Sequence, residues 1–363
     1  MKTLKVYCFP THQSDVRTSG VDYARLLSPM KYLNGYCDGE VKFKVDFYDI
    51  HDKEKTDWKV VAKEHDLLYF NYSILDWPYV FMAMPFHAMF HKKIIMDLDD
   101  AIWYVQKDNI SYDSIKKMRG PEILSDVIND VDGVTCTSSY LRNVIARETY
   151  KTHDKVKVMP NQVDLTLYNR KFPAKDRHTL TLLHYGSTSH FEDLVDPEFV
   201  KGIDKVFENY PNIQITLVGA FISELKKKWG KRYEHKFGHE DIYHWIKDKF
   251  PLYMDEADII VVPLRDTIYN RCKSEIKWLE VSSAMKPGVF SETRPYNDNI
   301  RHGITGYLAK YADDWYKYLK ILIDSKEKRL EIGTNAYKEV KKSRQQKDNI
   351  KEYASYFRQV VGI

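Results

Sequence analysis

The stretch from Val262 to Leu308 holds the residues of this chain that are best suited to chemistry. An apolar strand ends there, and a polar segment and a helix that contains Glu280 follow. The polar segment contributes Arg265, Asn270, Arg271 and Lys273. In a parallel sheet these groups would gather at the carboxyl edge of the strands, where α/β proteins bind ligands. Cations suit a diphosphate and a carboxylate suits ribose hydroxyls, so we expect Arg265, Asn270, Lys273 and Glu280 to bind a nucleotide sugar.

Two cations precede the helix that we expect over Glu275–Ala284. Positive charge is unfavourable at a helix N-terminus unless an anion compensates it, because the helix dipole is itself positive there. When a diphosphate departs from the anomeric carbon of a sugar, negative charge builds on the phosphate oxygens, and fixed cations stabilise that charge. We therefore expect Arg271 and Lys273 to act in catalysis, although a solvated pair of cations would have the same pattern. Glu280 lies about two helical turns beyond Lys273, and periodicity leaves its direction open.

A second candidate anion site is the Gly-Ser-Thr-Ser-His run at residues 186–190, which follows an expected strand and precedes a helix. A glycine there lets the backbone approach a ligand closely. Small hydroxyl residues can cap the following helix and leave its amide groups available to an anion. An ordinary strand-to-helix turn has the same composition. The run indicates an anion site only in combination with the cations described above. We expect Gly186, Ser187 and His190 to contact the donor.

An acidic turn, Asp97-Leu98-Asp99-Asp100, ends a strand in the first half of the chain. Clustered carboxylates at such a position can bind sugar hydroxyls, hold a divalent ion or take a proton. A helix-capping turn is the alternative. We expect hydroxyl binding rather than a metal site, with Asp99 and Asp100 catalytic and Asp97 in contact with an acceptor.

The loop after the first strand is a further close-approach site. It ends in a glycine at the start of a helix, which allows a substrate to come near the backbone. We expect Arg17, Ser19 and Gly20 to contact the acceptor, although an ordinary loop between a strand and a helix fits equally well.

Two other signals are weak. His235 and His239 are four residues apart, as zinc ligands on a helix would be, but Gly238 and the strand-like surroundings argue against that helix, and we expect no metal. The basic and aromatic cluster Lys226–Arg232 is expected to be a solvated face, and it is also the best candidate surface for a polyanion.

Length and composition describe a globular chain with more than one core. The chain has 363 residues, of which 43% are hydrophobic and 30% charged, and a net charge of +4. So small a charge does not require a nucleic-acid partner. Its four cysteines form no CxxC pair, which favours a reducing compartment. The N-terminus lacks the apolar run of a signal peptide and no stretch reaches the roughly 18–20 apolar residues of a membrane span, so we expect a cytoplasmic protein, at most peripheral at a membrane.

Short apolar runs alternate with amphipathic segments, a pattern typical of βαβ units and parallel sheets. The expected strands are Leu4–Phe9, Val41–Tyr48, Leu67–Phe70, Lys93–Met96, Gly133–Thr137, Lys155–Met159, Thr179–Tyr185, Ile213–Val218, Tyr233–Phe237, Asp258–Pro263, Gly288–Ser291 and Tyr307–Ala309. The expected helices are Val21–Leu33, Trp77–Phe90, Ile115–Val127, Ser139–Thr149, Pro197–Asn209, Ile242–Phe250, Glu275–Ala284 and Asp313–Ser325. The polar stretch from Asn161 to about Arg177 has no periodicity and is expected to link two domains.

Several motifs, in this order and spacing, resemble a known family over most of the chain. They are DLDD at Asp97–Asp100, VTCTSSYL at Val134–Leu141, VMPNQVD at Val158–Asp164, GSTSHFEDL at Gly186–Leu194, and the segment Asn270–Gly306. Together they resemble GT-B glycosyltransferases of the family 4 type, in its bacterial and phage branch.

The resemblance implies an α/β protein with two Rossmann-like domains that face each other across a cleft. It implies an acceptor-side domain over residues 1–165, a donor-side domain over 178–340, and a C-terminal helix over 341–363 that crosses back to the first domain. Glu280 matches the ribose-binding glutamate of the family, and Gly186 and Ser187 match its phosphate-contacting loop. The first glutamate of the family's paired motif and the Arg/Lys pair after its glycine loop are missing. The first-domain histidine of the family is not evident either, and the acidic turn stands near its place.

These observations predict a metal-independent transferase that moves a hexose from a nucleoside diphosphate sugar, UDP-glucose by preference, to an acceptor hydroxyl. Retention of anomeric configuration is the expectation from the family, and the acceptor is expected to be a cell-surface glycan or a lipid-linked sugar. Three alternatives stay open. One is a phage-type DNA glycosyltransferase acting on a 5-hydroxymethylated pyrimidine, the second is an inactive sugar-nucleotide-binding module, and the third is a sugar-nucleotide epimerase of related shape.

Overall fold

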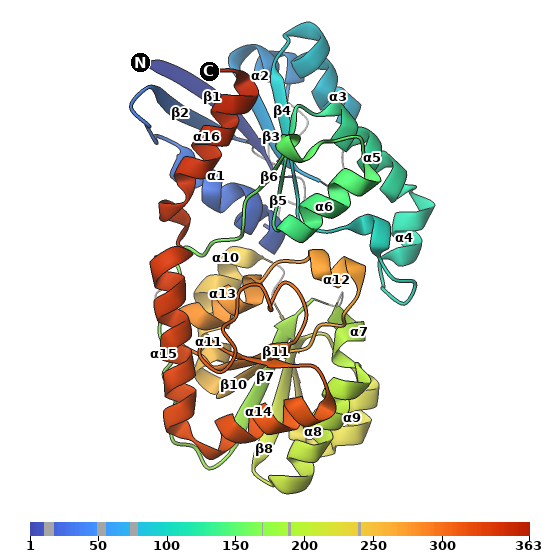
Figure 1. Cartoon of the computed structure of the whole chain (residues 1–363), viewed down its shortest axis with the longest axis vertical. Helices are drawn as coiled ribbons and strands as arrows, with labels where there is room; N and C mark the ends of the chain where they lie inside the picture. Colours follow the sequence, from blue (N-terminus) through green and yellow to red (C-terminus); the bar gives the residue numbers. More distant parts are fainter. Residues whose placement is uncertain (11–17, 49–55, 73–78, 169, 188–189, 239–240) are drawn as a thin grey trace. The chain divides into compact units, whose positions relative to one another are not determined.

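The chain forms two compact units (Figure 1). The computed structural model describes residues 1–363 with the exception of 11–17, 49–55, 73–78, 169, 188–189 and 239–240. The first unit comprises Met1–Val105, Asp113–Gln162 and Gln346–Ile363. The second comprises Gln106–Tyr112 and Val163–Gln345. The polar stretch that we expected as a linker therefore belongs to the second unit from Val163 onward.

A six-stranded parallel sheet in the order β2-β1-β3-β4-β5-β6 forms the centre of the first unit. Its strands are β1 (Lys2–Phe9), β2 (Val41–Phe47), β3 (Leu67–Asn71), β4 (Lys93–Leu98), β5 (Gly133–Cys136) and β6 (Val156–Val158). The helices include η1 (Asp22–Leu27), α1 (Ser28–Leu33), α2 (Trp58–Glu64), α3 (Tyr79–Ala83), η3 (Met84–Met89), η4 (Ile102–Tyr104), α4 (Tyr112–Lys117), α5 (Gly120–Asp130), α6 (Ser139–Glu148), η9 (Gln346–Asp348) and α16 (Ile350–Val361).

The second unit repeats this architecture with the strand order β12-β11-β10-β7-β8-β9, again all parallel. Its strands are β7 (Leu180–Gly186), β8 (Ile213–Gly219), β9 (Tyr233–Lys236), β10 (Ile259–Val262), β11 (Gly288–Ser291) and β12 (Tyr307–Ala309). The helices include α7 (Phe191–Leu194), α8 (Pro197–Asn209), α9 (Ser223–Trp229), α10 (Ile242–His244), η8 (Trp245–Lys249), α11 (Phe250–Glu256), α12 (Ile268–Cys272), α13 (Ile276–Ser283), α14 (Ala312–Asp324) and α15 (Lys326–Ser343).

All twelve strands expected from the sequence are confirmed to within a few residues, whereas several helices differ. The polar segment after β10 contains a short helix, α12, because the Thr267 side chain caps it by accepting from the backbone N–H of Asn270. The helix expected over Ile115–Val127 is divided into α4 and α5 at Arg119, which has a left-handed backbone with φ of 54°. Among the described residues, no helix is both long and apolar enough to cross a bilayer.

The C-terminal helix α16 is an integral part of the first unit. Its buried face, which includes Tyr353, Tyr356 and Phe357, belongs to the same apolar cluster as the strand residues of β1, β2 and β3. The Tyr356 hydroxyl accepts from Val134 N at 3.1 Å and donates to Lys155 O at 2.8 Å, so the helix is tied to two neighbouring strand ends. The apolar face that we expected at the end of the chain is thus buried against this sheet.

Helix α13, which contains Glu280, is held in the second unit by a close backbone contact. A Cβ atom at Gly333 of α15 would lie 2.1 Å from the carbonyl oxygen of Met285, just beyond the end of α13. Because the obstacle is backbone, it cannot move aside as a side chain could. Glycine at this position therefore allows α15 to pack directly against the end of α13.

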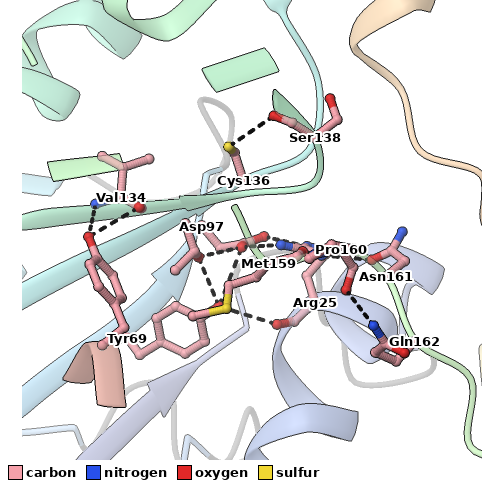
Figure 2. Close-up of polar contacts among 12 residues, drawn as sticks. Arg25, Tyr69, Asp97, Val134, Cys136, Ser138, Met159, Pro160, Asn161 and Gln162 are labelled. Atoms are coloured by element: carbon pink, nitrogen blue, oxygen red, sulfur yellow. Dashed lines mark hydrogen bonds and ion pairs between the residues drawn. The ribbon is translucent and has the colours of Figure 1, made fainter. Parts of the chain in front are cut away.

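A buried ion pair connects four segments of the first unit (Figure 2). Arg25 of η1 donates from Nε and Nη2 to the two oxygens of Asp97 at 2.9 and 2.8 Å, and both side chains are 1% exposed. Its Nη1 donates to Met159 O and to Asn161 Oδ1, each at 2.7 Å. Asp97 also accepts from the hydroxyl of Thr135 at 2.5 Å. A charge pair this deeply buried stays stable only because further hydrogen bonds complete it.

We predict that Arg25→Met will destabilise the chain by about 3–5 kcal/mol, because it leaves the Asp97 carboxylate buried without its partner. Adding Asp97→Asn to this variant should recover part of the loss, since the remaining amide is neutral. Urea unfolding of the wild type, both single variants and the double variant measures the coupling. If the two single losses simply add in the double variant, the pair is not the interaction described here.

Candidate functional site

The carboxyl end of β7 is the centre of the candidate site, because a glycine leaves space there. A Cβ atom at Gly186 would lie 3.1 Å from the His190 ring and 3.3 Å from both His184 Nε2 and Lys277 Nζ. Three polar side chains therefore converge on one point of the backbone. The neighbouring strand β8 must also end in glycine, since a Cβ atom at Gly219 would lie 2.0 Å from the carbonyl oxygen of Gly186.

Both histidines of this cluster are neutral at pH 7. His184 is 1% exposed and its Nδ1 lies 3.0 Å from Val261 O. Because a carbonyl only accepts, Nδ1 carries the hydrogen and Nε2 presents a lone pair, for which the described residues offer no hydrogen-bond partner. Burial lowers the pKa of His184 well below its usual value, and burial together with the charge of Lys277 lowers the pKa of His190 to about 4. The positive charge at Gly186 therefore comes from lysine and not from imidazolium.

Lys277 is a site residue that the sequence reasoning missed. It lies in the first turn of α13, and its Nζ is 5.0 Å from the ring centroid of Tyr185. Burial lowers the pKa of Lys277 to about 8, with the charge of Glu280 opposing this shift and the charge of Lys273 adding to it. A bound anion would stabilise the charged form of this ammonium group and raise its pKa. The available signal was its spacing three residues before Glu280, which places both on one helix face.

Glu280 is buried, with 8% exposure, and both of its oxygens are hydrogen-bonded. Tyr168 donates to Oε1 at 2.9 Å and Tyr185 donates to Oε2 at 3.0 Å. Burial raises the pKa of Glu280, while Lys277 and the two hydroxyls lower it. The carboxylate therefore points toward β7 and not into solvent, which settles the direction that periodicity left open.

A cavity of about 330 Å³ adjoins Tyr168, a volume within the range of about 300–1,000 Å³ that is usual for small-ligand sites. Its lining is mainly apolar and aromatic, and consists of Thr166, Leu167, Tyr168, Arg170, Phe172, Tyr243, Ile246, Lys247, Phe250 and Pro251. Tyr168 and Phe250 meet edge to face, with ring centroids 5.2 Å apart. An aromatic wall beside a buried carboxylate can accommodate a planar ring that is attached to a hydroxylated group.

Asp193 organises three of the residues predicted from the sequence, and its own role was not predicted. Its Oδ1 accepts from the backbone N–H of Arg265 and from the Asn270 amide, each at 2.9 Å, and its Oδ2 lies 2.9 Å from His190 Nδ1. Asp193 is only 3% exposed, so these bonds form in a water-poor environment. One carboxylate thus joins the loop after β7 to the segment after β10.

The predicted cations after β10 have different surroundings. Arg271 forms a bidentate pair with Asp266, at 2.6 and 2.7 Å, so its charge is locally compensated. The Arg265 guanidinium donates to Asp108 at 2.8 Å. Lys273 follows the last residue of α12, and its Nζ lies 4.7 Å from the ring centroid of Tyr269. Lys273 is thus the predicted cation that acts electrostatically on both His190 and Lys277.

The predicted acceptor residues lie in the first unit. Asp97 is the buried partner of Arg25 described above, so the carboxylate that we expected at an acceptor is engaged within the core. Asp99 and Asp100 follow the end of β4 and are half-buried. Ser19 accepts from the backbone N–H of Asp22 at 3.0 Å and so caps the start of the helical segment, with the exposed Gly20 next to it. The remaining residue of this prediction, at position 17, lies outside the described residues.

The basic cluster of α9 is largely engaged in local contacts. Lys226 donates to Tyr233 O at 2.8 Å, Lys228 pairs with Asp204 at 3.0 Å, and Arg232 binds Phe207 O at 2.5 Å. His235 Nε2 lies 3.2 Å from Gly219 O, and position 239 is outside the described residues. Among those residues, no group of three or more His, Cys, Asp or Glu side chains is arranged to hold a metal ion.

Comparisons with known proteins identify the architecture. The sequence matches no protein-family model and no curated protein sequence. Its structure is similar to sucrose-phosphate synthase from Thermosynechococcus elongatus, with a TM-score of 0.67 and 12% identity over 99% of each chain. It is also similar to Anabaena HepE in complex with UDP-glucose, with a TM-score of 0.64 and 13% identity over 97% of this chain and 100% of that one. A glycosyltransferase from Rickettsia africae gives a TM-score of 0.64 and 10% identity over 99% of each chain.

The chain has the GT-B fold. The fold class expected from the sequence is therefore confirmed, with one Rossmann-like parallel sheet in each unit. In this GT-B chain, the cluster around Gly186 lies at the carboxyl edge of the second sheet, which is where open α/β sheets bind ligands.

We predict that Lys277→Met will raise stability at neutral pH, because it removes an ammonium group whose burial is unfavourable. The sign follows from linkage. Between about pH 8 and pH 10.5 the unfolded chain retains a proton on this lysine that the folded chain has released, so wild-type stability rises with pH across this window.

The advantage of Lys277→Met should therefore shrink as the pH approaches 10.5. Denaturant unfolding of the wild type and of Lys277→Met at several pH values measures this difference in stability. Lys227→Met, which replaces an exposed lysine, is the matched control. A difference between Lys277→Met and wild type that stays constant across the window would contradict the burial of this ammonium group.

Proposed function

We propose that the chain is a glycosyltransferase that moves a hexose from a nucleoside diphosphate sugar, UDP-glucose by preference, to an acceptor hydroxyl with retention of configuration. The observation that supports this most directly is the position of Lys277 beside Gly186, with Lys273 close enough to lower its pKa and the buried Glu280 one helical turn further along α13. An ammonium group at a glycine strand end, repelled by a second lysine, is suited to bind an anion, and a carboxylate one helical turn away suits the hydroxyls of the attached nucleoside.

The solved structures of similar proteins agree with a nucleotide-sugar donor. Anabaena HepE was solved with UDP and glucose, TarM of S. aureus with UDP and α-GlcNAc-glycerol, and the pneumococcal O-GlcNAc transferase GtfA with UDP and GlcNAc. Those ligands belong to those proteins. They favour UDP as the first donor nucleotide to test for this chain.

Each part of the donor has a proposed partner. Gly186 lets the diphosphate approach the end of β7, and Lys277 and Lys273 compensate its charge. Glu280, oriented by two tyrosine hydroxyls, accepts from the ribose hydroxyls. The nucleobase enters the aromatic cavity beside Tyr168.

The chemical step is driven by charge on the leaving group. As the bond between the anomeric carbon and the diphosphate oxygen breaks, the acceptor oxygen forms a bond to that carbon and its proton passes to the departing diphosphate. Negative charge builds on the leaving oxygen in the transition state, and the two ammonium groups stabilise it. Because the pKa of Lys277 is about 8, the group is protonated at neutral pH. Lys277 thus takes the part that we expected of Arg271, whose guanidinium is paired with Asp266.

The acceptor is proposed to be a hydroxyl of a glycan or a lipid-linked sugar, oriented by Asp99 or Asp100. The charges of the α9 cluster are mostly committed to carbonyl groups and to Asp204, which leaves them poorly suited to follow a nucleic-acid backbone.

Titration with UDP and UDP-glucose tests the donor proposal. A ligand at 100 times its dissociation constant should stabilise the chain by about 2.7 kcal/mol, which thermal unfolding detects. The affinity for UDP should fall as the pH rises through about 8, because Lys277 loses its charge, and Lys277→Met should remove this pH dependence while Lys227→Met keeps it. If neither UDP nor any other nucleoside diphosphate stabilises the folded protein, the donor site is wrong.

We predict that Lys273→Ala will lower turnover at saturating donor by at least about tenfold, which corresponds to 1.4 kcal/mol, if the ammonium group acts mainly in the transition state. Lys273→Arg keeps the charge and should recover part of the rate. Steady-state transfer to a saturating acceptor, measured by UDP release, provides both values. Unchanged kinetics in Lys273→Ala would remove this lysine from the mechanism.

A further inference from the structure

Another cavity, of about 550 Å³, lies in the first unit and is lined by residues of α5 and of the end of α6. It is lined by Trp103, Pro121, Glu122, Ser125, Asp126, Asn129, Arg147, Glu148, Thr149 and Tyr150, all of which are described residues. We call this the α5–α6 groove. Its volume is within the range of about 300–1,000 Å³ that small-ligand sites occupy.

Hydrogen bonds hold the Trp103 side chain of this groove in place. The half-buried Trp103 donates from its indole N–H to Ser125 Oγ at 2.9 Å, and Ser125 donates to Glu148 O at 3.2 Å. This chain of bonds connects η4 to α5 and to the end of α6. An indole fixed in this way presents its ring without losing further side-chain freedom when a ligand binds.

The rim of the groove exposes a second aromatic side chain. Tyr150 is 93% exposed, although its backbone N–H donates to Asn129 Oδ1 at 2.8 Å. The next residue, Lys151, is anchored to the carbonyl oxygens of Asn129 and Val131. Tyr150 thus presents a large aromatic ring on an anchored backbone, an arrangement that suits contact with the apolar face of a ligand.

The polar groups of the groove include both donors and acceptors. Arg147 and Glu148 share a hydrogen bond of 2.9 Å, and the Tyr104 hydroxyl donates to the same Glu148 oxygen at 2.5 Å. Glu122 and Asp126 are exposed on the α5 side. The Arg147 side chain, which is 55% exposed, lines the same groove as the carboxylates of Glu122 and Asp126, so hydrogen-bond donors and acceptors lie within reach of a hydroxylated molecule.

We propose that the α5–α6 groove binds a neutral oligosaccharide, with the C–H faces of its rings on Trp103 and Tyr150 and its hydroxyls on Glu122, Asp126 and Arg147. On the proposed function, this oligosaccharide is a part of the glycan acceptor at a distance from the reacting hydroxyl. The groove would then favour long acceptors over short ones by raising the effective concentration of their reacting end. Binding itself does not depend on the donor site.

Binding is tested with maltohexaose, cellohexaose and N-acetylchitohexaose, each titrated separately into the full chain without nucleotide. Calorimetry gives the affinity, and the indole N–H resonance of Trp103, assigned through Trp103→Phe, reports on the location. We expect at least one of the three to bind and to shift that resonance. Tyr150→Ala should weaken its binding at least about tenfold, or 1.4 kcal/mol. Because Tyr150 is so exposed, this variant should keep its thermal stability.

Two controls locate the effect. Phe81→Ala, which removes an exposed aromatic side chain elsewhere in the first unit, should bind the oligosaccharide like the wild type. Lys277→Met should also keep full oligosaccharide affinity, because it changes only the donor cluster. With the transferase active, Tyr150→Ala should raise KM for a long acceptor and leave the rate with a monosaccharide acceptor unchanged.

Three results would overturn the proposal: no binding of any of the three oligosaccharides up to about 10 mM, binding that Tyr150→Ala leaves intact, or preferential binding of choline or tetralysine, which would make the groove a cation site. The donor proposal fails separately. A chain that binds the oligosaccharide but no nucleoside diphosphate would retain this groove and lose the proposed transferase activity.

Discussion

The arrangement of the candidate donor site depends on one buried carboxylate, that of Asp193. Its two oxygens hold the loop after β7, through His190, and the segment after β10, through the backbone of Arg265 and the amide of Asn270. These two segments are far apart in the sequence. Lys273 and Lys277 follow the second of them, the segment after β10. Because the group is buried, losing any one of these bonds would leave a polar atom unpaired in a water-poor environment.

Near Asp193 the site contains two positive charges that repel each other, one of them buried. Lys277 is protonated in surroundings that lower its pKa, Lys273 repels it, and the neighbouring histidines are neutral and offer no compensation. Glu280 and Asp193 are the nearby negative groups, and the oxygens of both are already hydrogen-bonded to other residues. A bound anion would relieve the repulsion between the two ammonium groups.

The strands could be predicted from the sequence because runs such as Ile259–Val262 are buried on both faces and therefore continuously apolar. The site could be predicted only in outline. Gly186 and Glu280 have recognisable sequence surroundings, whereas the roles of Asp193 and Lys277 depend on contacts between segments that no local pattern encodes. Arg271 illustrates the converse. Its position suggested a free cation, but the fold brings Asp266 within hydrogen-bonding distance, and only coordinates could reveal that pairing.

The hydrogen bond from Tyr168 to Glu280 has a consequence for domain exchange. Tyr168 precedes the second Rossmann-like sheet, in a stretch whose composition suggested a linker between two domains, yet its phenol fixes the carboxylate in the middle of α13. A chimaera joined at residue 178 would bring a foreign sequence to that carboxylate, whereas one joined before Val163 would keep the native phenol. Recombination between GT-B chains should therefore succeed at the earlier junction, even though the later one looks like the natural border.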